Sequence, residues 1–213
     1  MKTSIKNFSV AIVLVVLGGI FATTVMVRAF ADNKPVTITA TILETLTLAC
    51  NNASISNLTA GTPQSAQATC TVTTNGQNGF NLKVHKTTAS STATTTMVHS
   101  DNTTWITDAL TGYTGLPASA LAWTAGTTKG LGFRVRSVAG GTTNTNTNTD
   151  WGADETALNA KYAAFPVADQ TIYNYASYYA AAATVNIDYK LDVPTTQKSG
   201  AYTGTVQYTA TTN

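Results

Sequence analysis

Two stretches near the ends of the chain have an apolar residue at every second position. In residues 36–50 the even positions are mostly apolar and the odd ones mostly threonine; the apolar set is Val36, Ile38, Ala40, Ile42, Leu46, Leu48 and Cys50. Residues 202–210 repeat the pattern, with Tyr, Gly, Val, Tyr and Ala alternating with Thr and Gln. A period of two predicts half-buried β-strands in both places.

The same alternation predicts further strands at residues 68–72, 80–84, 131–135 and 185–193. Residues 75–79 read Asn-Gly-Gln-Asn-Gly, a turn sequence that predicts a hairpin between the first two of these strands. In the strand at 131–135, Arg134 and Arg136 would form a basic outer face. One short helix is expected at residues 153–164, where Asp154 and Glu155 favour its N-terminal end.

Composition supports an all-β fold. Threonine makes up roughly one residue in five, and β-branched side chains fit a pleated surface better than a helix. Many short strands between turn signals predict an immunoglobulin-like or jelly-roll β-sandwich with a long N-terminal strand and one short helix. We expect a single domain over residues 32–213, with polar loop insertions.

The first residues resemble a secretion signal. Lys2 and Lys6 precede an apolar run at 8–27, and Ala29-Phe30-Ala31 is a small-x-small cleavage pattern. We therefore expect a signal peptide at 1–31, a mature chain starting at Asp32, and a secreted, cell-surface protein. The apolar run is also long enough for an uncleaved membrane anchor, which remains the alternative.

Cysteine and charge content agree with export. Cys50 and Cys70 are the two cysteines, and in an oxidising compartment we expect them to form a disulfide on the inner faces of neighbouring strands. Charged residues make up 10% of the chain, with a net charge of +2. No basic patch indicates nucleic-acid binding, and so few charges suit a subunit that associates with copies of itself.

No motif indicates catalysis. His85 and His99 are expected to face solvent, and no nucleophile elbow, zinc-protease helix or phosphate loop occurs in the sequence. Asp150 and Asp154 could supply oxygen ligands to calcium, but Asp is expected in turns and at helix starts anyway. We expect no enzyme activity, no metal and no cofactor.

A group of aromatic residues lies between residues 162 and 179. Tyrosine has an apolar face and a polar tip, which suits protein interfaces and sugar rings as well as simple coverage of a sheet. The candidates for contact with another subunit or a glycan are Tyr173, Tyr175, Tyr178 and Tyr179.

Several of these features together resemble a known family. They are the strand running into Cys50, the loop ending in Gly61-Thr62-Pro63, Cys70 within an alternating strand, and the closing residues 199–206. In these the chain resembles bacterial spore coat protein U-type pilus subunits, over about the first 50 mature residues and the last 30. That resemblance implies a secreted immunoglobulin-like sandwich that polymerises by donating a strand to a neighbour.

The closing residues are also similar to the end of WxL cell-wall domains. Here the chain departs from the pattern, since Trp105, Trp123 and Trp151 are followed two residues later by Thr, Ala and Ala. Cell-wall binding by the Trp-x-Leu motif is therefore in doubt.

The length of the first strand suggests how assembly would occur. Residues 36–50 would extend roughly 50 Å, far more than an ordinary strand of five or six residues. Either the strand crosses between sheets near Leu43-Glu44, or residues 34–43 add to a neighbour's sheet edge, with Val36, Ile38, Ala40 and Ile42 buried there. The sequence thus favours a structural subunit of a surface fibre, pilus or layer; the alternative is a monomeric adhesin or carbohydrate-binding module, with a cell-wall or host glycan as partner.

Overall fold

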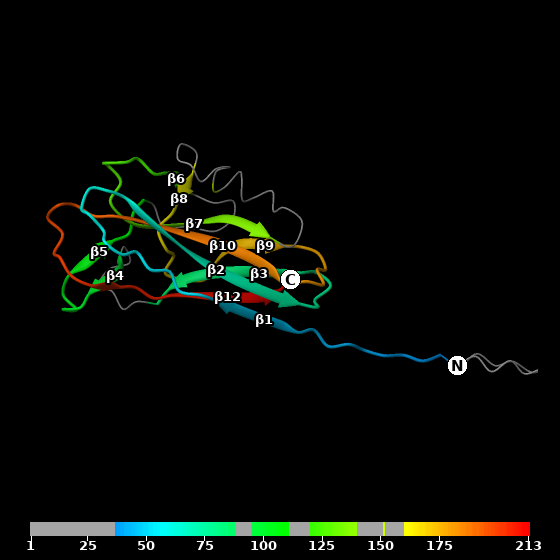
Figure 1. Cartoon of the computed structure of the whole chain (residues 1–213). Coiled ribbons are helices and arrows are strands. Elements are labelled where there is room, and N and C mark those ends of the chain that lie inside the picture. Colours follow the sequence, from blue (N-terminus) through cyan, green and yellow to red (C-terminus); the bar gives the residue numbers. More distant parts are fainter. Residues whose placement is uncertain (1–36, 88–94, 111–119, 140–150, 152–159) are drawn as a thin grey trace, which may run out of the picture. The chain divides into compact units, whose positions relative to one another are not determined.

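The computed structural model describes residues 37–87, 95–110, 120–139, 151 and 160–213 (Figure 1). Leu43–Asn213 forms one compact unit, and the segment ending at Ile42 is a separate one. The strands are β1 (Leu46–Cys50), β2 (Gln64–Thr74), β3 (Phe80–Lys86), β4 (Thr95–His99), β5 (Trp105–Thr107), β6 (Leu121–Ala122), β7 (Gly130–Ala139), β8 (Lys161–Tyr162), β9 (Gln170–Tyr175), β10 (Ala183–Asp192), β11 (Tyr202–Thr203) and β12 (Val206–Thr212).

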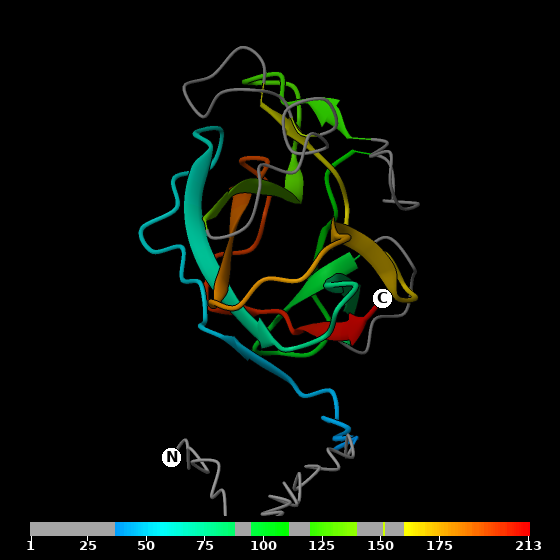
Figure 2. The same cartoon turned by 90° about the vertical axis from the view of Figure 1, so that its right-hand side faces the viewer.

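Antiparallel sheets pack together, which confirms the predicted all-β sandwich (Figure 2). Within the described residues the larger sheet has the order β1-β2-β10-β7, and a second has the order β12-β3-β9. Two smaller sheets, β11-β4-β5 and β6-β8, accompany them. Among the described residues no helix is long and apolar enough to cross a membrane, and the predicted signal segment at 1–31 lies outside them.

The core lies where the alternating pattern places it. Apolar positions in the middle of β2, β3, β7 and β10 are at most 5% exposed; they include Val72, Leu82, Phe133, Val185 and Ile187. Phe133 stacks on Phe165 with ring centroids 4.4 Å apart and also contacts Trp151 at 5.3 Å. The inner faces of these strands were therefore predicted correctly.

The predicted hairpin at residues 75–79 is wrong. β2 pairs with β1 and β10, whereas β3 pairs with β12 and β9, so the connection crosses from one sheet to the other. Gly79, with φ of 77°, makes this crossing possible because a Cβ there would lie 2.0 Å from the Tyr175 carbonyl oxygen. The apolar faces of β2 and β3 consequently both face the core.

The predicted helix at 153–164 is wrong over its last residues. Lys161 and Tyr162 form β8, and the backbones of Ala163 and Phe133 exchange hydrogen bonds of 2.9 and 3.0 Å. Residues 153–159 lie outside the described part of the chain. The segment at 161–163 lies beside β7, and the Tyr162 ring covers part of its predicted outer face: Arg134 is 1% exposed, and its guanidinium lies 5.8 Å from that ring.

Both terminal strands are shorter than predicted. At the N-terminal side the strand begins only at Leu46, and residues 37–45 form no strand. At the other end the alternating run is divided: β11 pairs with β4, and β12 pairs with β3. The division falls at Gly204, where a Cβ would lie 2.7 Å from the Thr96 carbonyl oxygen.

Candidate functional site

β1 is an edge strand that is anchored at both ends. Among the described strands it pairs with β2 alone, from Leu46 opposite Thr74 to Cys50 opposite Cys70. The predicted Cys50–Cys70 disulfide is present at one end, with the Cα atoms 4.1 Å apart. At the other end the side chain of Asn75 accepts a hydrogen bond from the Thr45 N–H at 2.6 Å and donates one to the Leu43 carbonyl at 3.0 Å. Cys70 is buried and Cys50 is exposed; because they are directly opposed partners in β1 and β2, both lie on the same face, with Cys50 on the edge strand.

β12 is the matching edge of the second sheet. Within the described residues it pairs with β3 alone. Its end is held by Asn213, whose amide donates hydrogen bonds to the carbonyl oxygens of Tyr175 at 2.7 Å and Asn78 at 2.9 Å. β12 lies beside β1 (Figures 1 and 2), and no backbone hydrogen bond joins these two described strands. We call the side of the sandwich bounded by β1 and β12 the open side.

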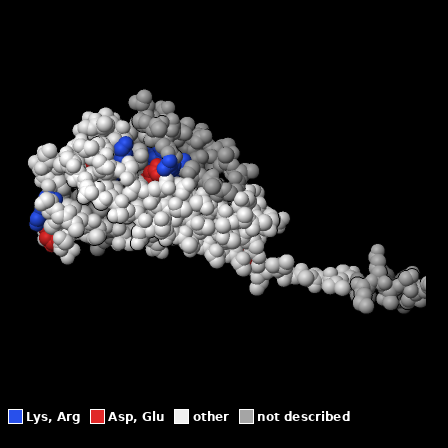
Figure 3. All heavy atoms as spheres, viewed as in Figure 1, with Lys and Arg blue, Asp and Glu red and all other residues white. Residues whose placement is uncertain are grey.

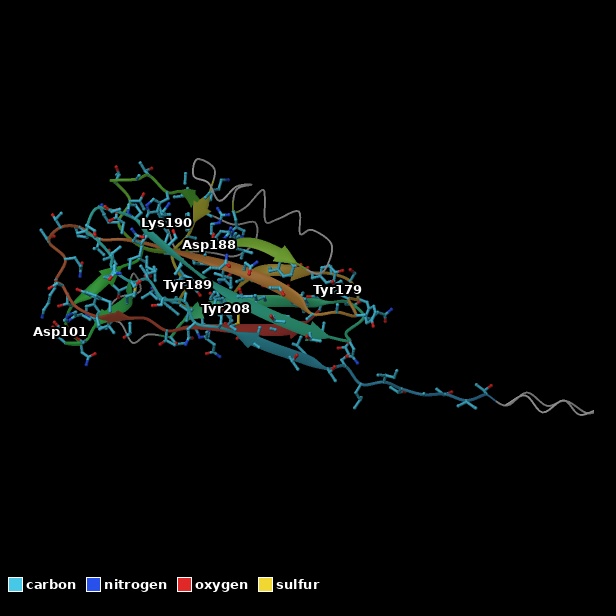
Figure 4. The ribbon with its side chains drawn as sticks, viewed as in Figure 1. Asp101, Tyr179, Asp188, Tyr189, Lys190 and Tyr208 are labelled. Atoms are coloured by element: carbon cyan, nitrogen blue, oxygen red, sulfur yellow. A yellow bond between two sulfur atoms is a disulfide. The ribbon has the colours of Figure 1, made fainter. Side chains whose placement is uncertain are left out.

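Apolar side chains at the open side are only partly buried. They pack against the core and are supplied by both strands: Leu46, Leu48, Val206, Tyr208 and Ala210. The hydroxyl groups of Tyr208 and Tyr189 lie 2.6 Å apart (Figure 4) and link β12 to β10. Burial raises the pKa of both phenols, so each stays a neutral donor and acceptor. The open side is thus an apolar surface, and the hydrogen bond between Tyr208 and Tyr189 holds the side chains beneath it in place.

The predicted donor segment is exposed where the structure describes it. The side chains of Ile38 and Ile42 are 90% and 84% exposed, and Ala40 is also exposed. Leu43, which follows them, is 81% exposed. Val36 lies outside the described residues. The exposed apolar side chains at every second position of this segment form a surface whose burial would be favourable in free energy.

The predicted aromatic group divides into core and surface residues. Tyr173 and Tyr175 are 0% and 7% exposed and pack against Phe80, so they cannot contact a glycan or another subunit as expected. Burial raises the pKa of Tyr173 to about 12. Tyr178 is 56% exposed, and Tyr179 packs edge-on against Tyr175 at 5.9 Å. Of the four candidate tyrosines, Tyr178 and Tyr179 are the two that reach the surface.

The two histidines lie on different strands. His85, on β3, keeps 24% of its side chain exposed, and its Nδ1 lies 2.6 Å from an oxygen of Asp169. His99 ends β4 and is only 7% exposed, so its predicted solvent-facing position is wrong. It packs against Tyr202 with ring centroids 4.9 Å apart, and Gly200 leaves room for the imidazole. The described residues hold no group of three His, Cys, Asp or Glu side chains fit for a metal; Asp150 and Asp154 lie outside them.

Sequence reasoning missed a charged cluster on the outer face of β7 and β10. Asp188 lies 3.6 Å from Arg134 and 3.9 Å from Arg136 and accepts a hydrogen bond from Gln67. The Lys190 ammonium lies 5.4 Å from the Trp123 ring and 5.3 Å from that of Tyr162. Figure 3 shows basic and acidic atoms gathered on this face, and Figure 4 places Asp188 and Lys190 along one strand. The outward positions of the alternation were the available signal, but the aromatic residues that cover them are Trp123, which follows β6, and Tyr162 of β8.

Comparison with known proteins found no family model, no curated protein and no solved structure that matches this chain.

Proposed function

We propose that this protein is an exported structural subunit that assembles with copies of itself through β-strand addition. Residues 34–43 of one copy add to the open side of the next. The observation that carries the proposal is the combination of an exposed, alternating apolar segment with an apolar sheet edge in the same chain.

The donor segment supports the proposal by its pattern and length. Ile38 and Ile42 share one face of an extended chain, and threonines occupy the other. Residues 37–43 would extend roughly 23 Å, the same as the seven residues of β12. One added strand could therefore cover the whole of that edge.

The acceptor supports the proposal by its unmet hydrogen-bonding capacity. An edge strand exposes a row of N–H and C=O groups, and β1 and β12 both end their sheets within the described residues. Natural sandwiches protect such edges with charges or prolines, yet neither strand contains Lys, Glu, Asp, Arg or Pro. Leu48 and Tyr208 supply partly buried apolar surface next to these edges.

Export is supported by two observations. The sequence of residues 1–31 has the layout of a signal peptide, and the Cys50–Cys70 disulfide fits an oxidising compartment. Without the added strand, an open apolar edge would favour aggregation at high concentration. In a surface fibre, pilus or layer, a strand of the neighbouring subunit would cover that edge in a regular arrangement.

Deletion and add-back test the proposal. A variant lacking residues 32–43 should be a monomer of about 18 kDa by light scattering, while the full mature chain forms large assemblies that tolerate salt. A synthetic peptide of residues 34–43 should then bind the shortened protein with one-to-one stoichiometry, because it restores the missing strand.

A matched pair of substitutions shows which face is buried. Ile38→Asp should prevent assembly and, in the peptide, reduce binding at least tenfold, because it would bury an unpaired charge. Thr39→Asp places the same charge on the solvent face and should have little effect. Equal assembly of both variants would contradict strand donation. The adhesin alternative would be favoured if the mature chain were monomeric and bound a glycan on an array, with binding lost on substitution of Tyr178 or Tyr179.

A further inference from the structure

A lysine and an aspartate are buried together between two sheets. Lys86 ends β3, and Asp108 follows directly after β5. The Lys86 Nζ lies 2.6 Å from Asp108 Oδ2, and the two side chains are 4% and 2% exposed. Neither residue has a role in strand donation.

The surroundings disfavour charge on this pair. Burial raises the pKa of the Asp108 carboxyl more than the hydrogen bonds from Lys86 and Thr96 and the charge of Lys86 lower it. The second oxygen of that carboxyl, Oδ1, is buried, and among the described residues no hydrogen bond to it has good geometry, although Thr96 lies close enough to lower the carboxyl pKa. A buried ammonium–carboxylate pair is costly to desolvate, and moving the shared proton from Nζ to Oδ2 would remove both charges. The product of that transfer is a neutral amine facing a neutral carboxylic acid.

The backbone holds the two groups in place. The Lys86 N–H donates to the Pro166 carbonyl at 2.9 Å, and Lys86 pairs with Val206 of β12. Asp108 forms a β-bridge with Leu131, and the next N–H, that of Ala109, donates to the Leu131 carbonyl at 2.8 Å. The 2.6 Å contact between Nζ and Oδ2 brings Nζ roughly 3.5 Å from Cγ, so that attack needs only a movement of Nζ out of the carboxyl plane.

We propose that Lys86 and Asp108 condense to an intramolecular isopeptide bond. The neutral Nζ attacks Cγ, the Nζ–Cγ bond forms and the Cγ–Oδ2 bond breaks. Oδ2 leaves with two protons as one water molecule, and Nζ keeps one hydrogen while Oδ1 becomes the amide oxygen. No oxidant, reductant or other reactant is needed.

The bond would join two sheets covalently. Lys86 and Asp108 are 22 positions apart, and their strands belong to the sheets β12-β3-β9 and β11-β4-β5. Such a bond resists reduction, unlike the disulfide between β1 and β2.

Two other ion pairs of the chain serve as internal comparisons. Lys129 and Asp192 lie 2.7 Å apart, but the lysine side chain is 28% exposed. Lys198 and Asp101 also lie 2.7 Å apart, with side chains 55% and 24% exposed. In both pairs the lysine side chain is accessible to water, whereas that of Lys86 is not. The distance from Nζ to the carboxylate oxygen is nearly equal in the three pairs, and burial distinguishes Lys86 and Asp108 from the other two.

Intact mass and tryptic mapping of the purified full chain test the proposal. After reduction of the disulfide, the mass should be about 18 Da, one water molecule, below that of the sequence. Trypsin should not cleave after Lys86, so that a looped peptide spanning residues 84–129 replaces the separate peptides 84–86 and 87–129. A mass equal to that of the sequence, with cleavage after Lys86, would show an ion pair only and overturn the proposal.

Variants assign the mass deficit to this pair. Lys86→Arg and Asp108→Ala should each restore the full mass and lower the melting temperature, whereas Lys129→Arg should keep the deficit. A deficit that survives Lys86→Arg would overturn the assignment. If both variants fail to fold, the wild-type peptide map still decides, since it needs no substitution.

Discussion

Gly79 occupies a backbone position that another residue can take only if β9 moves. Its φ is 77°, and an added Cβ would lie 2.0 Å from the carbonyl oxygen of Tyr175 and 2.8 Å from that of Ser177. Gly126 has nearly the same φ, 79°, but an added Cβ would meet nothing within 4 Å. Substitutions at these two glycines therefore distinguish the cost of a steric clash from the cost of a positive φ.

We expect Gly126→Ala to cost about 1 kcal/mol, since it adds only the strain of positive φ. Gly79→Ala should cost about 3 kcal/mol or more, because a backbone carbonyl must also move. Urea unfolding of both variants measures the difference. Equal losses would mean that the crossing between β2 and β3 can shift without cost.

Single residues also show where the sequence was and was not sufficient. Leu82 and Ile187 lie at alternating apolar positions, and their burial was predictable from that alone. Arg134 was not predictable, because alternation marks an outer face but does not say that Tyr162 covers it. Gly204 interrupts an otherwise regular strand pattern, and such a glycine signals close backbone approach; it was the available sign that the last strand is divided.

At the scale of elements, the disulfide fixes β1 to β2. The bond closes a loop with a separation of 20 residues, which corresponds to about 3 kcal/mol in the chain-entropy description. The double variant Cys50→Ala, Cys70→Ala should lose about this much stability. Reductant should lower the melting temperature of the wild type and leave that of the double variant unchanged. A wild-type melting temperature that is insensitive to full reduction would contradict the estimate.

The strands themselves were more predictable than their partners. Residues 75–79 are good turn residues both for a hairpin and for a crossing between sheets, so only packing of the β2 and β3 faces decides between them. The alternation at residues 36–50 likewise predicts a face to be buried but not which chain buries it. This explains why Ile38 and Ile42 could be named as candidate donor residues from the sequence, while β12 could be proposed as an acceptor only with the structure.

At the scale of the whole molecule, buried tyrosines should make the fold sensitive to alkali. Burial raises the pKa of Tyr173 to about 12 from 10.0, and it raises those of Tyr162, Tyr189 and Tyr208. Above pH 10 the unfolded chain releases phenolic protons that the folded chain retains, so stability is full below pH 10 and falls as the pH rises toward about 12.

Melting temperature and tyrosinate absorbance, measured together from pH 8 to pH 12, test this expectation. We expect exposed tyrosines to ionise first and the buried ones only as the protein unfolds. Ionisation of every tyrosine near pH 10 in protein that remains folded would contradict the assignment of these four side chains to closed environments.

The position of the disulfide also determines how the molecule would respond to tension. A pull on the N-terminal end of β1 shears its hydrogen bonds with β2 and then passes through Cys50 directly to Cys70 in the interior of β2. The disulfide bypasses residues 51–69, so these residues carry no force and cannot be extended while the bond is intact. Reduction would release roughly 65–70 Å of additional extension. The oxidised subunit is therefore short and stiff at the end where a neighbour would pull on it, and reduction would turn that end into an elastic tether.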